Sequence, residues 1–474
     1  MTVTKRRAKK VVLVVAALAV LGGGTAVAVI ARSGREVTTT SEQAYRLYRK
    51  GLEDERRLYH KDALASYAKA LELDPHFAMA TLRLAGLLGG RDRDRAKSLV
   101  QCVARNHGSL TEREHLALGI FEAEVLAGDM KKSGELIREY VKRFPDDPEG
   151  YYRLAGVLMR EGKGDETLAT YARLLSLDPN QAVAYTFLGY HFIGRRDFVR
   201  GEDYLKRYRF LAPDQANPYD SLGELYANTG RYDEAEENLK RALEIKPDFI
   251  PAIGHLGTLE VGRGNPEAAA AHFRRAVEMS ESWKEKHNFV GALASSLLDA
   301  GRPDEALAEL DRASAAMPAL APREEFFFRY QVTRSRAVVL ALAGRAAEAE
   351  AELERLPALP ADLEEKQKVE LEKGLLGPKA ALAGARGEHE EAVRLLKAFL
   401  VDEKARASGE FGYYPGMFRL RVRLAKALVS LGRPEEAREE LRPVLAVNPR
   451  FAPALEVIAH IEGRAPEAKG SAGR

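Results

Sequence analysis

The sequence predicts an all-α fold built as a solenoid of stacked helix hairpins, and three observations predict it. Apolar residues recur at the helical period on both sides of Gly230 within residues 216–249. No run of residues alternates with the period of two that is typical of strands. A fixed step of 34 residues separates Pro145, Pro179, Pro213 and Pro247. Because one hairpin cannot bury its own apolar face, such a period predicts hairpins that stack on their neighbours.

Residues 216–249 form the hairpin from which the rest of the chain can be aligned. A first apolar stripe precedes Gly230, which is free to take the left-handed conformation that ends a helix. A second stripe follows, and Pro247 stops it. The two stripes consist of Tyr219, Leu222, Gly223 and Tyr226, then Tyr232, Ala235, Leu239 and Ala242.

This pattern resembles the tetratricopeptide repeat family, whose signature has the same residue types in the same order. The resemblance implies a right-handed superhelical solenoid. It also implies that the first helix of each hairpin lines a concave groove that holds an extended peptide or a helix of a partner. The signature positions are Tyr219, Leu222, Gly223, Tyr226, Gly230, Ala235, Leu239, Ala242 and Pro247.

The same pattern can be followed in both directions from this hairpin. It predicts an N-terminal array over residues 44–283, beginning with a hairpin at 44–76. After residue 280 the phase slips by about three residues. A less regular array with a capping helix is predicted over 284–463, with weak hairpins turning at Gly344 and Gly387. About eleven hairpins and a cap result, followed by a flexible tail at 464–474.

Two aromatic segments interrupt the regular pattern, at residues 326–330 and 411–418. Phe326, Phe327 and Phe328 could form an exposed binding patch, although packing across an irregular helix interface is the favoured interpretation. The aromatic residues around Tyr414 could fold back on the array or contact a partner. The sequence leaves both questions open.

The N-terminus predicts a membrane anchor. Residues 1–10 form a basic segment expected in the cytoplasm, and residues 11–31, from Val11 to Ala31, carry no charge. Twenty-one residues at 1.5 Å each span roughly 31 Å, which matches the hydrocarbon core of a bilayer. Cleavage of the segment as a secretory signal is the alternative. Residues 32–43 are predicted to be a linker that leads to an array outside the cytoplasmic membrane.

No catalytic, cofactor or metal signature is present, so we predict neither an enzyme nor a bound cofactor or metal. The ten histidines are scattered, without ligand spacing. Cys102 shares a helical stripe with Leu99 and Val103, which predicts a buried, inert thiol. With 73 basic and 70 acidic residues interspersed along the chain, the sequence has no nucleic-acid footprint.

A protein or peptide partner is therefore expected. Transferring the groove positions of the family to this sequence makes eight residues candidates for binding it, with the alternative that they are solvated positions of a spacer. The slots of the family's known carboxylate clamp hold no Lys and Asn pairs, so an acidic, aromatic groove would suit a basic or aromatic peptide. The eight candidates are Tyr152, Thr186, Tyr190, Asn217, Asp220, Glu224, Asn228 and His255.

A second resemblance covers roughly residues 38–276. These residues look like the repeat regions of bacterial signalling proteins that carry a kinase or DNA-binding domain before a membrane span, yet only ten residues precede the span here. The resemblance implies a bacterial origin. Together with the predicted anchor and repeats, it leads us to expect a scaffold for protein–protein interactions in the bacterial inner membrane, single-pass, with its array extracytoplasmic. The alternatives are a soluble secreted array released by signal cleavage and an enzyme built on the C-terminal half, which would need titratable residues converging around 320–420.

Overall fold

The computed structural model describes residues 37–56, 59–89, 92–106, 110–179, 181–281, 283–317, 320–407 and 416–464, and in these residues helices and turns are the only elements. The all-α prediction is confirmed for this part of the chain. The helices are α1 (Glu42–Arg56), α2 (His60–Leu73), α3 (Ala78–Leu88), α4 (Arg93–Arg105), α5 (Glu112–Phe121), the π-helix η1 (Glu122–Ala127), α6 (Met130–Arg143), α7 (Pro148–Arg160), α8 (Gly164–Leu177), α9 (Ala182–Gly194), α10 (Phe198–Leu211), α11 (Ala216–Asn228), α12 (Tyr232–Ile245), α13 (Ile250–Arg263), α14 (Pro266–Met279), α15 (Trp283–Asp299), α16 (Pro303–Ala315), α17 (Pro322–Leu342), α18 (Ala346–Glu354), α19 (Glu365–Gly374), α20 (Leu376–Ala385), α21 (His389–Ala407), α22 (Gly416–Ser430), α23 (Pro434–Val447) and α24 (Ala452–Ile461).

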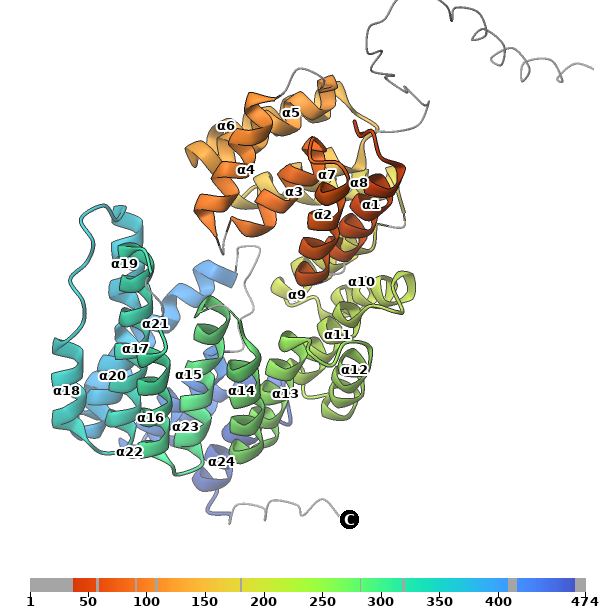
Figure 1. Ribbon diagram of the computed structural model, residues 1–474. Helices are drawn as coiled ribbons and strands as arrows, with labels where there is room; N and C mark the ends of the chain where they lie inside the picture. The colour runs from red at the N-terminus through yellow and green to blue at the C-terminus, as the bar shows by residue number, and fades with distance from the viewer. Residues whose placement is uncertain are drawn as a thin grey trace, which may run out of the picture.

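Consecutive helices pack in pairs as hairpins, and the pairs stack into a curved array (Figure 1). The turns predicted at Gly344 and Gly387 are confirmed, because both glycines have a φ of +79° between paired helices. The extra helix α19 interrupts the C-terminal half between α18 and α20. The right-handed superhelix stays a prediction.

The first described residues form hydrogen bonds with the array. Thr38 donates hydrogen bonds from its backbone nitrogen and its hydroxyl to the Glu114 carboxylate, at 2.7 and 2.8 Å. Asp74 accepts from the hydroxyl of Thr39 at 2.6 Å and from the backbone nitrogen of Thr40 at 2.9 Å. Both carboxylates are buried. The described part of the predicted linker is therefore held by the array, and α1 begins at Glu42, before the predicted end of the linker at residue 43.

Residues of the first hairpin contact the middle of the chain, at the N-terminal end of α11 and the C-terminal end of α12. The backbone nitrogen of Ala216 donates to the hydroxyl of Tyr59 at 3.4 Å. The ammonium of Lys246 lies 3.9 Å from the centre of the Tyr59 ring and 3.7 Å from the Asp62 carboxylate. These contacts join residues more than 150 positions apart.

Residues of the last hairpin contact the C-terminal end of α11 and the beginning of α12. The hydroxyl of Tyr232 donates to Oδ1 of Asn448 at 3.1 Å, and Nδ2 of Asn448 donates to the carbonyl oxygen of Ala227 at 3.3 Å. The guanidinium of Arg450 lies 5.0 Å from the centre of the Tyr232 ring. Helix α24 packs against α13 as well as α22. In Figure 1, α11 and α12 accordingly lie between the N-terminal helices and α24.

A partly buried ionic network joins three of the first four hairpins. Arg83 on α3 lies 2.6 Å from the carboxylate of Glu149 on α7 and 3.7 Å from that of Glu55 on α1. Arg153 contacts the same oxygen of Glu149 at 2.9 Å. The Arg83 side chain is only 11% exposed, so the low surrounding dielectric strengthens these pairs.

The prediction for Cys102 is wrong, because its thiol is exposed. The buried side chains of α4 are Ala96, Val100 and Val103, spaced at one helical face. Cys102 lies about 100° around the helix from Val103. The grouping with Leu99 and Val103 therefore placed the thiol on the wrong side of the helix.

The aromatic segment at 326–330 packs inside the protein. Phe326, Phe328 and Tyr330 are buried, and Phe326 and Tyr330 form a local core with Leu363 and Leu371. This confirms the packing interpretation over an exposed aromatic patch. In the second segment, residues 411–415 lie outside the described chain.

The turn between α9 and α10 uses Arg196 where the other hairpin turns with a positive φ use glycine. Arg196 has a φ of +61° and is the only non-glycine with a positive φ among the described residues. This conformation crowds Cβ against the carbonyl oxygen and costs about 1–2 kcal/mol for an L-residue. We predict that Arg196→Gly raises the free energy of unfolding by about 1 kcal/mol, measured by urea unfolding. No gain would mean that the contacts of the arginine offset the strain.

The predicted membrane segment, residues 11–31, lies outside the described chain. Within residues 37–464, as far as they are described, no helix is both long and apolar enough to cross a membrane.

Candidate functional site

Four of the eight candidate residues meet on one face formed by α9, α11 and α13. The hydroxyl of Tyr190 donates to Oε2 of Glu224 at 2.5 Å. Nδ1 of His255 lies 2.8 Å from Oδ1 of Asp220, and its Nε2 lies 3.8 Å from Oε1 of Glu224. We call Tyr190, Asp220, Glu224 and His255 the acidic cluster. The repeat brings them together, because equivalent slots of neighbouring hairpins are 34 or 35 residues apart, and Asp220 and Glu224 are one turn apart on α11.

The acidic cluster holds a charged histidine at neutral pH. Burial acts to lower the pKa of His255, but the carboxylates of Asp220 and Glu224 outweigh it and raise that pKa to about 9. Burial, with Glu224 and Asp220 beside it, raises the pKa of Tyr190 well above its ordinary value, so its hydroxyl stays a donor. Two carboxylates and one imidazolium leave a net negative charge, and the Glu224 and His255 side chains remain about a quarter exposed.

We predict that His255 makes stability depend on pH. A group whose pKa is raised in the folded state contributes stability that is fully present below its unfolded pKa, near 6.5, and that is lost as the pH rises through about 9. The difference in free energy of unfolding between the natural chain and His255→Gln should therefore shrink over this window, by up to about 1.4 kcal/mol per pH unit. Urea unfolding at intervals from pH 6 to 10 measures it.

His272→Gln is the matched control, since burial lowers the pKa of His272 and its contribution changes at acidic pH instead. If the difference in free energy of unfolding between the natural chain and His255→Gln stays constant from pH 6 to 10, the neighbouring carboxylates do not raise the pKa of His255.

The remaining four candidates do not join the acidic cluster. Asn217 is buried, and its Nδ2 donates to the hydroxyl of Tyr208 at 3.1 Å. Asn228 is buried at the other end of α11, and Thr186 is half-buried on α9. Tyr152 on α7 is 41% exposed, with its ring 6.4 Å from that of Phe187. The groove assignment stays a prediction, and several of its members are enclosed by the fold.

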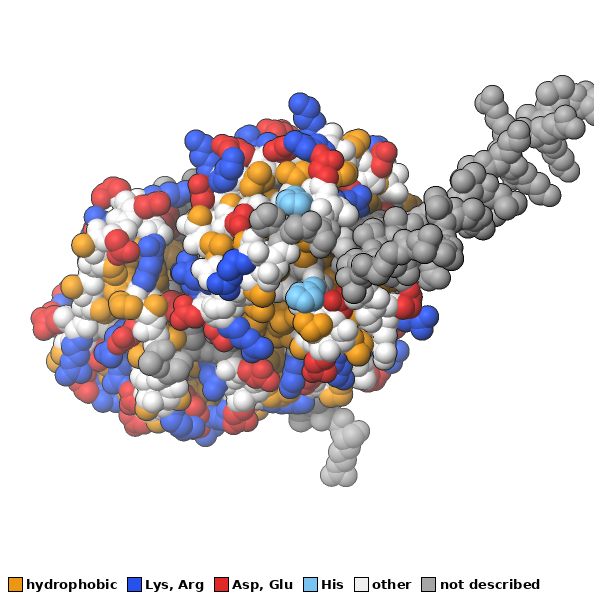
Figure 2. Space-filling view, turned by 45° about the horizontal axis from the view of Figure 1, so that its top comes forward, with side chains coloured by type: hydrophobic (Ala, Val, Ile, Leu, Met, Phe, Trp, Pro, Cys, Tyr) orange, Lys and Arg blue, Asp and Glu red, His pale blue; other side chains and the backbone are white. Residues whose placement is uncertain are grey.

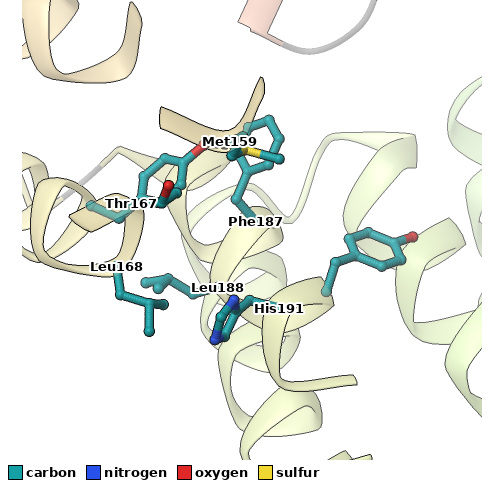
Figure 3. A pocket seen from close by; sticks show the side chains of 8 residues that line it. Met159, Thr167, Leu168, Phe187, Leu188 and His191 are labelled. Atoms are coloured by element: carbon teal, nitrogen blue, oxygen red, sulfur yellow. Dashed lines mark hydrogen bonds between the residues drawn. The ribbon is translucent and has the colours of Figure 1, made fainter. Parts of the chain in front are cut away.

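Two features of this region have no signal in the sequence. Tyr59 comes from the first hairpin and borders α11 beside the buried Tyr208. A small pocket is lined by residues of α7, α8 and α9, namely Met159, Thr167, Leu168, Phe187, Leu188 and His191 (Figure 3). A contact between residues 157 positions apart has no repeat spacing, and the apolar residues of a pocket cannot be distinguished from core residues by their period.

The face shown in Figure 2 has no large patch of a single charge sign. Figure 2 shows Lys and Arg side chains interspersed with Asp and Glu over the whole face in view. In the described part of the chain, no group of three or more His, Cys, Asp and Glu side chains could hold a metal ion. The side chains of the acidic cluster can recognise a ligand by charge and hydrogen bonds.

Comparison with known proteins relates the chain to one repeat family. Models of the tetratricopeptide repeat match residues 121–182, 221–249, 256–322, 331–355 and 385–461. No curated protein matches the chain.

Solved structures that match the chain have low sequence identity and TM-scores below 0.5. A tetratricopeptide repeat protein from Parabacteroides merdae is 17% identical, with a TM-score of 0.40, over 55% of this chain and 96% of its own. The APC/C hetero-tetramer Cut9–Hcn1 is 15% identical, with a TM-score of 0.44, over 88% and 76%. Yeast Tom70 is 15% identical, with a TM-score of 0.39, over 89% and 95%.

Proposed function

We propose that this chain, which belongs to the tetratricopeptide repeat family, is a scaffold. It would bind a protein partner through the face of α9, α11 and α13. The observation that carries the proposal is the acidic cluster, in which three successive first helices present partly exposed polar side chains at one place. Stacked repeats create extended surfaces of this kind, and partners are bound through a few well-placed side chains on them.

The charge of the acidic cluster indicates the chemistry of the partner. Asp220 is buried and already paired with His255, whereas Glu224 is partly exposed and carries the charge that His255 does not neutralise. A basic segment of a partner complements this charge, and complementary charge favours both specificity and the rate of association. The proposed ligand is therefore a basic peptide segment.

Charge reversal tests this proposal. The full-length chain and its Glu224→Lys variant would be isolated from the native cells under mild conditions, and the proteins bound to each would be identified by mass spectrometry. We expect Glu224→Lys to lose a partner that the natural chain retains. Glu237→Lys is the matched control, because Glu237 is exposed on α12 and lies outside the acidic cluster. Identical sets of bound proteins for all three chains would contradict the proposal.

We further propose that residues 11–31 anchor the array outside the cytoplasmic membrane of a bacterium. The support is the uncharged length of this segment after a basic cluster. Only residues 32–36 separate it from Val37, which packs against the first core of the array, so the array would lie within about 20 Å of the bilayer. The mature N-terminus tests the anchor: intact mass should include residues 11–31, whereas a chain that begins near residue 29 would show cleavage of a signal.

A further inference from the structure

Helix α10 presents two large apolar side chains to solvent on one face. Val199 is 74% exposed and Phe210 is 83% exposed, more than any other large apolar side chain among the described residues. They lie eleven residues apart, about three turns of helix, so they share one side of α10. Figure 1 shows α10 at the edge of the array. These two side chains therefore form the ends of an uncovered face.

The repeat itself does not account for this apolar face. In the neighbouring hairpins, the residues at one or two steps of 34 from these positions are polar and exposed. Stacking of the hairpins thus leaves these positions in water, and an apolar pair there indicates a surface that another molecule covers. The corresponding residues are Asp165 and Ser176 on α8, Asp233 and Glu244 on α12, and Glu267 and Glu278 on α14.

Two charged residues between the apolar ones indicate which molecule covers this face. Asp203 and Arg207 lie on the same side of α10, and both are exposed. Neither forms a hydrogen bond or an ion pair with another described residue. From its N-terminus, the face is therefore apolar, acidic, basic and apolar.

This order is complementary to a copy of itself. A second α10 that runs in the opposite direction brings Val199 of each copy to Phe210 of the other, and Asp203 to Arg207. Such reciprocal contacts are what a two-fold interface requires. A second α10 that runs in the same direction would instead place Asp203 against Asp203 and Arg207 against Arg207, which repel.

We infer that the chain forms a two-fold dimer through antiparallel α10 helices. The inference goes beyond the proposed scaffold function, because α10 is the second helix of its hairpin and the acidic cluster lies on the first helices α9, α11 and α13. The dimer would hold two acidic clusters in one assembly. A contact through one helix pair is smaller than the standard interface of roughly 1,600 Å², so we expect a weak dimer that is populated at about 100 µM.

Sedimentation equilibrium of the purified full-length chain, in detergent matched to the density of the buffer, tests the dimer. Phe210→Glu introduces the residue that α12 and α14 have at this position, so it should be tolerated by the fold. It should weaken the dimer about a hundredfold, because each dimer buries this side chain twice. Met130→Glu is the matched control, since Met130 is exposed on α6 and should leave the dimer unchanged. A natural chain that stays monomeric up to about 1 mM, or a Phe210→Glu dimer as tight as the natural one, would overturn the inference.

Exchange of the two charges tests the antiparallel pairing. Asp203→Arg should weaken the dimer about tenfold, because like charges then face each other at both ends of the interface. Adding Arg207→Asp to this variant should restore the dimer, because opposite charges face each other again. A double variant as weak as Asp203→Arg would overturn the pairing. Because these measurements use no partner, any such failure would leave the scaffold proposal and its own charge-reversal test standing.

Discussion

Replacing Gly230 by alanine should destabilise the chain by about 2–4 kcal/mol and release the C-terminal end from α11. Gly230 has a φ of +80°, and an added Cβ would lie 2.6 Å from Oδ1 of Asn448. Asn448 would have to move, which would break its hydrogen bonds to Tyr232 and to the carbonyl oxygen of Ala227. Urea unfolding would measure the loss of stability, and amide hydrogen exchange in α24 would measure the release.

Gly301→Ala is the matched control for this prediction. Gly301 has a φ of +74°, and an added Cβ would meet nothing within 4 Å. This variant therefore carries the backbone strain alone, about 1 kcal/mol, and should leave exchange in α24 unchanged. Equal losses for Gly230→Ala and Gly301→Ala would show that Asn448 does not hold the C-terminal end of the array to α11 and α12.

Replacing Arg83 by methionine should lower the free energy of unfolding by about 3–5 kcal/mol. The side chain of Arg83 is almost fully buried between the carboxylates of Glu149 and Glu55, which lie on different hairpins. Methionine can fill much of the space but leaves these carboxylates with less compensating charge. The loss should appear as a lower urea midpoint for the helices α1 to α7.

Two further variants check the cause of that loss. Arg138→Met removes an exposed pair with Glu161 and should leave the midpoint unchanged, since exposed ion pairs contribute little. Adding Glu55→Gln to Arg83→Met should restore part of the stability, because a carboxylate that Arg83 paired is then neutral, whereas Glu149 keeps its pair with Arg153. If the double variant is no more stable than Arg83→Met, lost packing and not unpaired charge explains the effect.

The hairpins were predictable from the sequence because their signals are local. Apolar residues at the helical period define each helix, and glycine marks the turn, as Gly344 and Gly387 confirm. The failure at Cys102 shows the limit of this reasoning. Neighbouring positions on one helix can be exposed or buried depending on how the next helix packs, and a short stripe does not fix that orientation.

The long-range contacts of the first and last hairpins with α11 and α12 were not predictable from the sequence. Tyr232 and Asn448 are 216 residues apart, and Ala216 and Tyr59 are 157 apart. Curvature accumulates over many hairpins, so the position of each end depends on small rotations that the repeat pattern does not encode. Arg83 is a similar case, because its partners come from the first and fourth hairpins.

The candidate site was predictable in part for the same reason. Tyr190 and Glu224 occupy one slot of successive hairpins, so the repeat itself brings them together. Burial of Asn217, Asp220 and Asn228 results from tertiary packing around α11. His191 gives no sequence signal, since a lone histidine on an apolar helix is usually a core residue.

Photo-crosslinking in living cells tests the central claim most directly. A photoreactive amino acid would replace Tyr190 in the acidic cluster and, in a second chain, Val199, which is 74% exposed on α10. The scaffold account predicts one recurrent protein adduct from position 190 that is absent from position 199. Adducts from position 199 alone, or no protein adduct from position 190, would contradict binding at the face of α9, α11 and α13.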